Sequence, residues 1–474
     1  MCKSHLANTC SFPHGALAVT GRRTRAVEAI LLVFAWGVGA AAYVLVDLGA
    51  TGSIGSGTRG ILLITAGIVV GLALTMRVLA RFADPILLPS VVAINLIGLA
   101  MIHRLDLSVA RSAVDSGSLI PRADLGAQLL WMGVGLGLFI LVLLFIRDHR
   151  RLQRYTYTAG LAGVVLLLLP LLPVIGKTIN GANLWIHIGP LSFQPAEASK
   201  ILLVIFFAGY LVRARHQLAT VRTKVLGVPL PRMRDLGPIL LVWAASLLVL
   251  VGQRDLGTSL LLFAIFVVML YVSTGRWNWL VIGALLMSIG AFLGYMGFHH
   301  VRVRFDIWLH PFADAANTGY QLVQSLYGLA SGGMFGSGLG QGHPGLVPFA
   351  KSDFIGAALG EELGLYGLTA ILMLYAIAVE RGLRISVVVK DDFGRLLSFG
   401  FAFVLAFQTF LVLGGVTRLI PLTGLTTPFL SYGGSSLVMN WVMIALLLRI
   451  SNDARRPQRT VEASDDALTQ VIHR

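Results

Sequence analysis

Long apolar runs constrain this chain more than any other feature of its sequence. A helix that crosses a bilayer needs about 20 apolar residues, and the chain holds about 12 candidate runs. They lie at roughly residues 27–49, 60–80, 86–103, 127–146, 157–176, 198–213, 237–252, 255–274, 278–298, 361–380, 394–414 and 430–450. Barrel strands are short and alternate in hydrophobicity, so these continuous runs exclude a barrel. The sequence therefore predicts an all-α fold, a polytopic transmembrane helix bundle of about 12 spans.

Composition and charge agree with this class. Of the 474 residues, 56% are hydrophobic and 12% are charged, which is more apolar surface than a soluble domain can bury. With a cytoplasmic N-terminus and alternating spans, 26 of the 37 lysines and arginines fall on the cytoplasmic side. Such an excess is typical of cytoplasmic loops. The net charge of +15 therefore reports topology, both termini are expected in the cytoplasm, and no nucleic-acid partner is expected.

The same pattern divides the chain into segments. We expect a cytoplasmic basic tail at 1–26, two N-terminal transmembrane helices at 27–80, the main membrane region at 86–450 and a second cytoplasmic tail at 451–474. Both cysteines, Cys2 and Cys10, fall in the first tail. No structural disulfide and no cysteine metal site are therefore expected.

The most informative polar stretch is Trp308–Gly342, inside a large outer segment at 299–360. It carries a lone carboxylate, Asp314, between the turn signals His310-Pro311 and Asn317-Thr318-Gly319. A short helical segment and a glycine-rich run follow. The glycine run lacks the Gly-Lys-Ser/Thr ending of a phosphate loop, so we interpret it as flexible re-entrant backbone. A hydrophobic chain that keeps such a segment at the membrane surface is expected to do its chemistry there.

Several ionisable residues near the membrane boundaries allow two interpretations. Arg104 either pairs locally or faces an anionic ligand, because guanidinium matches phosphate oxygens. Glu197 and Lys200 share a helix face and either neutralise each other or place a cation at the mouth of an intramembrane cavity. Arg254 and Asp255 point about 100° apart on a helix, so each is expected to pair with other helices or to bind a ligand.

The remaining outer segments add two observations. The last outer loop, residues 414–436, contains Arg418 and many Pro, Gly and Thr residues. Such backbone is tolerated at membrane depth only where it lines a cavity or is buried in protein. Glu361 and Glu362 begin a span, where carboxylates favour the helix N-terminus. The outer histidines lack the i,i+4 spacing of a helical zinc site, so no dedicated zinc site is expected.

Five ordered motifs resemble one family, the shape, elongation, division and sporulation (SEDS) proteins of the RodA/FtsW type, over roughly residues 86–450. The motifs are Trp185…Phe193-Gln194-Pro195…Glu197…Lys200; Gln253…Asp255-Leu-Gly-Thr258; Asp314…Gly319-Tyr320-Gln321…Gln324-Ser325; Ser352-Asp353-Phe354…Gly360-Glu-Glu-Leu-Gly364; and Pro421…Thr423-Gly424…Pro428-Phe…Ser431-Tyr-Gly-Gly-Ser435. The family core has about ten spans, so residues 27–80 look like an addition. Two departures are Lys351-Ser352, where the family commonly has His-Thr, and Arg254, where Pro is common.

The resemblance implies a peptidoglycan glycosyltransferase that polymerises lipid II, an undecaprenyl-diphosphate-linked disaccharide peptide. The reaction is expected at the outer face of the bacterial cytoplasmic membrane. Implied partners are a class B penicillin-binding transpeptidase and the elongation or division machinery. The segment Thr417-Arg418-Leu-Ile-Pro421 is more similar to the elongation branch, which serves cell shape, than to the division branch. Asp314 matches the family's essential loop aspartate, and Gln321, Gln324 and Ser325 belong to the same motif and are expected to contact substrate.

Polymerisation from a lipid diphosphate sets the expected roles. A base must take the proton of the attacking sugar hydroxyl, and Asp314 is the candidate. The leaving diphosphate must be neutralised, by a divalent metal (Mg²⁺ or Mn²⁺) or by basic side chains. The expected substrate-binding residues are Lys200 with Glu197, Arg104, Arg254 with Asp255, and Arg418, together with the three residues of the Asp314 motif. Lys200 is the preferred cation.

Two other functions remain as alternatives. A flippase or transporter for the lipid-linked precursor would need polar groups through the whole depth of the bilayer. A scaffold that only recruits a transpeptidase would not need Asp314. The polar and ionisable residues of this chain are concentrated in its predicted outer loops. This distribution favours an enzyme over a flippase.

Overall fold

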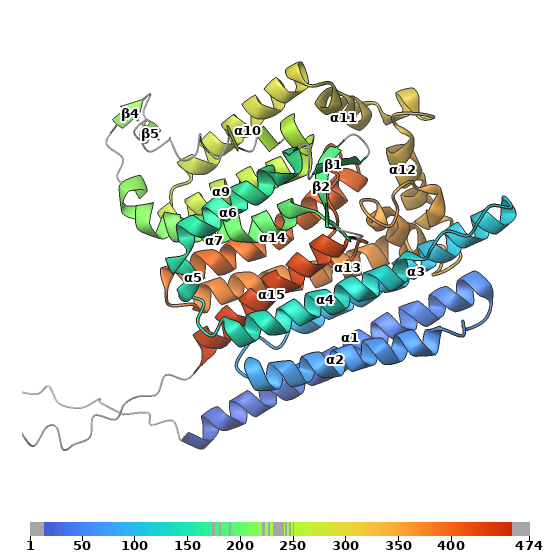
Figure 1. Ribbon diagram of the computed structural model, residues 1–474, viewed down its shortest axis with the longest axis horizontal. Helices are drawn as coiled ribbons and strands as arrows, with labels where there is room; N and C mark the ends of the chain where they lie inside the picture. Colours follow the sequence, from blue (N-terminus) through green and yellow to red (C-terminus); the bar gives the residue numbers. More distant parts are fainter. Residues whose placement is uncertain are drawn as a thin grey trace, which may run out of the picture.

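The structure is a computed structural model that describes residues 14–172, 176–179, 182–188, 191–219, 223–225, 228–230 and 251–456, with five isolated positions between 241 and 249. Most of the predicted apolar run 237–252, both cysteines and residues 457–474 lie outside the described residues. The labels of Figure 1 are used throughout.

The helices follow the apolar runs. They are α1 (His14–Thr51), α2 (Thr58–Leu79), α3 (Leu87–Asp115), α4 (Asp124–Phe145), α5 (Arg151–Arg154), α6 (Thr156–Leu168), α7 (Pro195–Ala219), α9 (Leu256–Thr274), α10 (Asn278–Gly297), α11 (His299–Leu309), α12 (Tyr320–Gly332), α13 (Ile355–Val388), α14 (Asp392–Val416) and α15 (Gly434–Arg455). Short 3-10 turns are η1 (Leu169–Leu171), η2 (Pro311–Asp314) and η3 (Pro344–Leu346).

The predicted all-α membrane bundle is confirmed, and the count of about 12 spans stays a prediction because most of the run 237–252 lies outside the described residues. Among the described residues, ten helices are long and apolar enough to cross a membrane. The predicted run 157–176 instead forms the shorter α6, which tightens into η1 at Pro170. Proline removes a backbone donor and clashes with the preceding turn, so it ends the α-helix early. The orientation of the termini stays a prediction.

Two small antiparallel sheets interrupt the helical pattern. One contains β1 (Gly176–Ile179), β2 (Ala182–Ile188) and β3 (Leu191–Phe193) in that order, and the other pairs β4 (Thr223–Val225) with β5 (Val228–Leu230). In the first sheet Ile186 lies opposite both Gly176 and Phe193. This sheet occupies the loop before α7, where Gly-Pro and Gln-Pro in the sequence indicate a structured connection.

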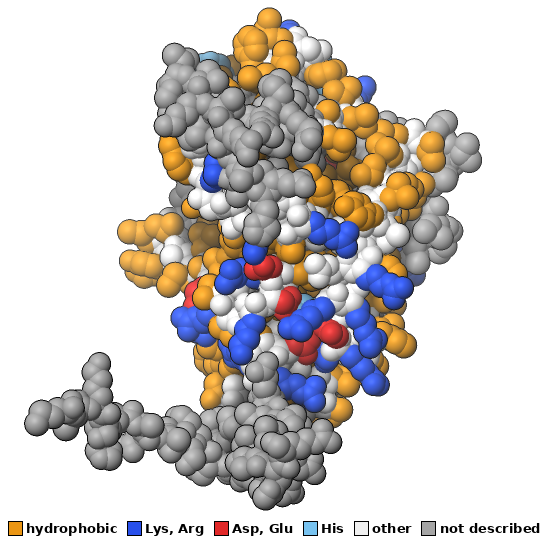
Figure 2. All heavy atoms as spheres, turned by 90° about the vertical axis from the view of Figure 1, so that its left-hand side faces the viewer, with side chains coloured by type: hydrophobic (Ala, Val, Ile, Leu, Met, Phe, Trp, Pro, Cys, Tyr) orange, Lys and Arg blue, Asp and Glu red, His pale blue; other side chains and the backbone are white. Residues whose placement is uncertain are grey.

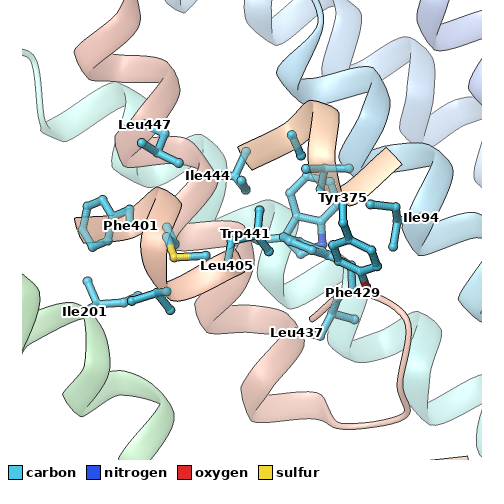
Figure 3. Packing of buried hydrophobic residues seen from close by; sticks show 14 of the residues in the cluster. Ile94, Ile201, Tyr375, Phe401, Leu405, Phe429, Leu437, Trp441, Ile444 and Leu447 are labelled. Carbon is cyan, nitrogen blue, oxygen red and sulfur yellow. The ribbon is translucent and has the colours of Figure 1, made fainter. Parts of the chain in front are cut away.

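The core lies where α3, α4, α7, α13, α14 and α15 meet. Trp441 of α15 is 1% exposed and makes edge-to-face contacts with Phe139 and Phe429, at centroid distances of 5.8 and 5.4 Å. Figure 3 shows Trp441 between Tyr375, Phe429 and Leu405, which come from different segments. In a membrane, side-chain packing of this kind replaces the hydrophobic effect as the force that holds helices together.

The first two helices pack along one side of this core (Figure 1), with α1 against α3. Near its C-terminal end, α1 places Asp47 at 2.8 Å from His103 Nε2, and the ring of His103 stacks on Tyr43. Trp36 Nε1 of α1 donates to Thr65 Oγ1 of α2 at 3.2 Å. A buried carboxylate is stable only with such partners, so polar contacts fix α1 to its neighbours.

Helix α13 is kinked at Gly364, which has φ +68°. The glycine run Gly332–Gly342 packs against this kink and takes up its main-chain groups: Ser337 N donates to Glu361 O at 3.0 Å, and Leu365 N donates to Gly333 O at 2.9 Å. Kinks free main-chain groups that must find other partners inside a membrane protein. The sequence-based interpretation of this run as flexible is therefore corrected, because hydrogen bonds fix its path.

Basic side chains gather at one end of the bundle. One end, here called the basic end, contains the start of α1, α5 and the end of α15 (Figure 1), and Figure 2 shows lysines and arginines gathered there with a few carboxylates among them. The opposite end, here called the loop end, contains α11, α12 and the segment 311–354. Asp314 therefore lies at the end opposite the basic cluster.

Candidate active site

Asp314 ends the turn η2 at the loop end and is partly exposed. Its Oδ1 accepts a hydrogen bond from Asn317 Nδ2 at 2.8 Å. Its Oδ2 accepts from Thr318 N at 3.1 Å and from Thr318 Oγ1 at 2.8 Å. Gly319 allows the loop to fold back, because a Cβ there would overlap the carbonyl oxygen of Pro311. The carboxylate is thus held by its own loop, in the turn that the sequence predicts.

These contacts also set the ionisation of Asp314. Hydrogen bonds from Thr318 N, Asn317 and the Thr318 hydroxyl lower the pKa of this carboxyl below its ordinary value of 3.8. Asp314 is therefore ionised at neutral pH, as a general base must be. Asn317 and Thr318 are exposed, so an incoming hydroxyl can reach the carboxylate and replace one of these donors.

Arg418 holds the segment that precedes this turn. Its Nε and Nη2 donate to the carbonyl oxygens of Trp308 and Leu309, both at 2.8 Å, and Trp308 Nε1 donates back to Arg418 O at 3.1 Å. Arg418 has φ +61°, a conformation that costs a non-glycine residue about 1 kcal/mol or more. The contacts of the surrounding loop hold Arg418 in this strained conformation. Through its side chain, Arg418 fixes the last outer loop to the end of α11.

Helix α12 follows the Asp314 turn directly and carries the other three residues of its motif. Ser325 is buried, and its hydroxyl donates to Val416 O at the end of α14, at 3.2 Å. Gln321 and Gln324 are half-buried and three residues apart, hence on one helix face. Ser325 therefore anchors α12, while the substrate contacts predicted for all three residues stay predictions.

Lys200 and Glu197 lie inside the bundle near the start of α7. Lys200 Nζ is 2.7 Å from Glu197 Oε2 and donates to Gln408 Oε1 of α14, also at 2.7 Å. Gln408 Nε2 in turn donates to Thr426 O of the last outer loop at 2.9 Å. The cavity beside this pair has a volume of about 10 Å³, which holds one water molecule at most. The predicted ion pair of Glu197 and Lys200 is present. It lies in the closed interior of the bundle and not at the mouth of an open cavity.

A second cluster joins the buried Asp255 with the half-buried Arg304 and Asp353. Arg304 of α11 donates from Nη1 to the carbonyl oxygens of Leu422 and Thr423, both at 3.0 Å. Asp255 caps α9 by accepting from Thr258 N at 2.9 Å, while its Oδ2 is buried without a hydrogen-bond partner among the described residues. Asp255 lies close enough to Arg304 for their opposite charges to attract each other.

Asp353 belongs to the same cluster. Burial raises the pKa of Asp353 to about 6, although the nearby charge of Arg304 lowers it. The two carboxylates also repel each other. Arg304 therefore neutralises part of a doubly acidic site, directly under the loop that contains Thr423 and Gly424. Arg254, next to Asp255 in the chain, is exposed and has φ +58°.

Arg104 has a different environment from the one expected of a phosphate contact. It is 5% exposed, with Nε at 2.7 Å from Glu362 Oε1 and Nη2 at 2.6 Å from Gly342 O. Glu362 Oε2 also accepts from Gly340 N at 2.9 Å. Arg104 and Glu362 together fix the glycine run. Of the two interpretations allowed by the sequence, the structure therefore shows Arg104 in local pairing. A diphosphate contact by Arg104 stays a prediction.

A cavity of about 730 Å³ opens beside this pair at the loop end. Its lining comes from the end of α1, the end of α3 and the glycine run, and includes Arg104, Arg111 and Asp115. A pocket of this size falls within the range of small-molecule sites. The N-terminal helix α1 thus contributes to the lining of a sizeable cavity at the loop end.

A divalent metal stays a prediction. Asp314 already accepts three hydrogen bonds from its own loop. Among the described residues, one group of His and Asp side chains is close enough to share an ion, namely Asp148, His149 and Asp453 at the basic end. It lies far from the Asp314 turn in the fold, so it does not supply the predicted catalytic metal.

Sequence reasoning missed Gln408, Arg304 and Asp353 as site residues. Gln408 was detectable as a lone amide inside an apolar run, since polar groups at membrane depth are seldom accidental. Asp353 stands in one of the five motifs, and Arg304 follows a His-rich outer segment. The signal that Arg304 and Asp353 belong together exists only in the folded chain.

Comparison with known proteins supports the same family. A family model described as "Cell cycle protein" (FtsW/RodA/SpoVE) matches residues 85–456. "Peptidoglycan glycosyltransferase RodA" of Mycobacterium tuberculosis (strain ATCC 25618 / H37Rv) is 51% identical over 407 residues, covering 85% of this chain and 86% of the relative. The protein of the same name from Mycobacterium leprae (strain TN) is 46% identical and covers 95% and 96%. A "Probable peptidoglycan glycosyltransferase FtsW" of Geobacter sp. (strain M18) is 30% identical.

Solved structures agree. A chain described under "Structural coordination of polymerization and crosslinking by a peptidoglycan synthase complex" matches with a TM-score of 0.62 at 29% identity, over 79% of this chain and 99% of its own length. The crystal structure of Thermus thermophilus rod shape determining protein RodA matches with a TM-score of 0.55 at 26% identity, over 79% and 98%. The resemblance read from the five motifs is thereby confirmed, and the chain belongs to the FtsW/RodA/SpoVE family.

Proposed function

We propose that this chain polymerises lipid II into glycan strands on the extracytoplasmic side of the membrane, with Asp314 as general base. It is a peptidoglycan glycosyltransferase, and its identity to the RodA relatives (46–51%) exceeds that to the FtsW relatives (30–34%), which favours cell elongation over division. The observation that carries the proposal is an ionised carboxylate, Asp314, displayed in an exposed loop and held by donors that substrate can displace.

The chemistry follows from this geometry. The sugar hydroxyl of one glycolipid approaches Asp314 and exchanges with the Thr318 hydroxyl, which removes one of the bonds that lower the carboxylate's proton affinity. Asp314 takes the hydroxyl proton as the oxygen attacks the anomeric carbon of the second glycolipid. The bond from that carbon to the diphosphate breaks, and the lipid diphosphate leaves with the electron pair. General base catalysis of this kind contributes about 10²–10⁴-fold.

The leaving diphosphate needs positive charge. Arg418 and Arg254 are the exposed candidates at the loop end, and Lys200 is a buried one that becomes available if substrate opens the contact with Gln408. A divalent metal is the alternative source of charge. The flippase alternative is disfavoured because the cavity beside Lys200, at about 10 Å³, offers no path to a sugar headgroup.

The decisive experiment is a gel assay of glycan chains made from lipid II by the purified full-length protein. Asp314→Asn keeps the size of the side chain and removes the base, so we expect polymer yield to fall at least about 100-fold. Asp306→Asn, an exposed carboxylate of α11, is the matched control and should remain active. Normal turnover by D314N in a correctly folded preparation would overturn the assignment. Parallel reactions with EDTA, Mg²⁺ or Mn²⁺ test the metal.

Sidedness rests on the charge difference between the two ends and is tested separately. Cytoplasmic surfaces carry the excess of basic residues, and the basic end lies opposite Asp314. With Cys2 and Cys10 replaced by Ser, a membrane-impermeant maleimide should label Ala316→Cys in intact cells stripped of outer layers. Arg154→Cys should react only after permeabilisation. The reverse pattern would place the loop end in the cytoplasm.

The proposed partner is a transpeptidase that cross-links the new glycan. Its support is the likeness to a chain of a peptidoglycan synthase complex that coordinates polymerization and crosslinking. Co-purification of the full-length chain with the class B penicillin-binding transpeptidase of the same cell tests it, and a faster polymerisation rate in the complex is expected. Failure of the two proteins to associate in detergent and in lipid discs would reject this partner.

A further inference from the structure

A second large cavity lies at the basic end, between the end of α2 and the end of α15. Its volume is about 850 Å³. It is lined by Val78, Leu79, Arg81, Phe82, Arg449, Asn452 and Arg456. Among these described lining residues three are arginines and none is a carboxylate. Nothing in the polymerisation chemistry uses this cavity, because it is at the opposite end from Asp314.

Arg449 forms the buried wall of the cavity. It is 8% exposed, and its guanidinium donates to Leu79 O at 3.5 Å and to Arg147 O, and lies 3.4 Å from Asp453 Oδ1. Its Nε is buried and has no hydrogen-bond partner among the described residues. The guanidinium of Arg449 adds positive charge to the wall of the cavity, and Asp453 offsets part of that charge.

Arg81 and Arg456 form the exposed rim. In the described part of the chain neither takes part in an ion pair, and the Arg81 guanidinium lies over the ring of Phe82 at 5.1 Å. The neighbouring Arg455 is different, because Asp84 holds it at 2.6 Å.

The adjacent cavity of about 330 Å³ is also different, since Asp148, Asp391 and Asp453 line it together with its basic residues. In that cavity the three carboxylates offset most of the positive charge of the lining. The lining of the cavity at α2 and α15 contains no carboxylate, and its two rim arginines make no ion pair among the described residues.

An apolar surface borders this charge. Val78, in the last turn of α2, is 77% exposed and belongs to a helix that is apolar enough to cross the membrane. Leu79 is half-buried beside it. Arginines set next to lipid-facing apolar side chains match a phospholipid, whose phosphate and acyl chains are joined at the same depth. Basic pockets between transmembrane helices on the cytoplasmic side bind anionic lipid headgroups.

We propose that this cavity binds the headgroup of an anionic glycerophospholipid. The phosphate accepts hydrogen bonds from the guanidinium groups of Arg81 and Arg456, which suit phosphate oxygens geometrically, while Arg449 adds positive charge to the wall behind them. The acyl chains run along Val78. The lipid bridges α2 and α15, and so connects the N-terminal helix pair to the helix that centres the core.

The test measures lipid binding by the purified full-length protein with native mass spectrometry. The protein, freed of bound lipid in detergent, is titrated with phosphatidylglycerol, phosphatidylcholine or glycerol 3-phosphate. The variant R81Q/R456Q removes two rim charges that make no ion pair. The matched control R151Q/R154Q removes two exposed charges from α5, at the same end but outside the cavity.

We expect the wild type and R151Q/R154Q to bind phosphatidylglycerol alike and R81Q/R456Q to bind about tenfold more weakly, as loss of charge-assisted hydrogen bonds implies. The single variants R81Q and R456Q should be intermediate. Equal losses in both double variants would mean that general attraction to basic surface suffices, and would overturn the site. Binding of phosphatidylcholine as tight as that of phosphatidylglycerol would also overturn it. Glycerol 3-phosphate bound as tightly as the lipid would reject a lipid in favour of a free phosphate.

Discussion

Arg418 and Trp308 contact each other in both directions: Arg418 Nε donates to Trp308 O at 2.8 Å, and Trp308 Nε1 donates to Arg418 O at 3.1 Å. These two residues are 110 positions apart in the chain. Their contact fixes the end of α11 against the last outer loop, and the turn that ends in Asp314 begins three residues after Trp308. The Asp314 loop is therefore positioned by Arg418, a residue whose sequence context predicts a contact with diphosphate.

Substitutions of Arg418 separate these two roles. If Arg418 acts as a clamp, Arg418→Lys loses the planar fork and should lower kcat as much as Arg418→Gln, about tenfold, with KM little changed. If its charge holds the diphosphate, R418K should keep most activity and R418Q should raise KM. Steady-state kinetics of lipid II polymerisation distinguishes them. We expect the clamp pattern, and Arg122→Gln, an exposed arginine of the same end, should behave as wild type.

Glu197 and Lys200 are best examined as a pair. Lys200→Met leaves the Glu197 carboxylate buried without its cation, which typically costs 3–5 kcal/mol. The double variant E197Q/K200M removes both charges and should recover most of the stability measured by thermal unfolding in detergent. If the proposed contact of Lys200 with the diphosphate is made, polymerisation should stay lost in the double variant. Recovery of activity together with stability would show that the pair is only structural.

The glycine run can be tested by two matched substitutions. Gly336 has φ +84°, and a Cβ there would overlap the carbonyl oxygen of Glu362, so Gly336→Ala should destabilise the protein by more than about 2 kcal/mol. Gly338 has φ +101°, and a Cβ there would have its nearest neighbours at 3.9 Å. Gly338→Ala therefore introduces backbone strain without a steric overlap. Scanning fluorimetry should give a clearly lower melting temperature for G336A. Equal shifts would mean that contact with α13 contributes nothing.

His149 makes stability depend on pH at the basic end. Hydrogen bonds and charges of Asp391 and Asp453 outweigh burial and raise the pKa of His149 to about 9, from an ordinary 6.5. Because the folded state binds this proton more tightly, the stabilisation is complete below pH 6.5 and is lost as pH rises through 9. The pKa of Asp391, lowered to about 2, gives stabilisation that is lost only as pH falls below 3.8.

Melting temperatures should therefore decline between pH 6.5 and 9 in the wild type. His149→Gln should be less stable at pH 6 and should show a flatter profile over this range, since it has no proton to lose. His299→Gln, an exposed histidine at the loop end, is the control and should keep the wild-type slope. An unchanged slope in H149Q would contradict the assignment of the titration to His149.

Sequence-based predictions were accurate where the interacting residues are close together in the chain, and less accurate where they are far apart. Apolar runs predicted most helices, because the length of an apolar segment is a local property. The turn signals around Asp314 predicted a displayed carboxylate, because Asn317, Thr318 and Gly319 are its own neighbours. The run 157–176 was less well predicted, because Pro170 shortens a helix that hydropathy alone extends.

The sequence by itself therefore determined the membrane class, the family and the turn that displays Asp314, since each depends on residues that are close in the chain or on a fixed order of motifs. Only the tertiary structure decided the partners of the charged residues. Arg104 meets Glu362 across 258 positions and Lys200 meets Gln408 across 208. A buried charge accepts any partner of suitable geometry. Which residue becomes that partner therefore depends on how the helices pack and not on spacing along the chain.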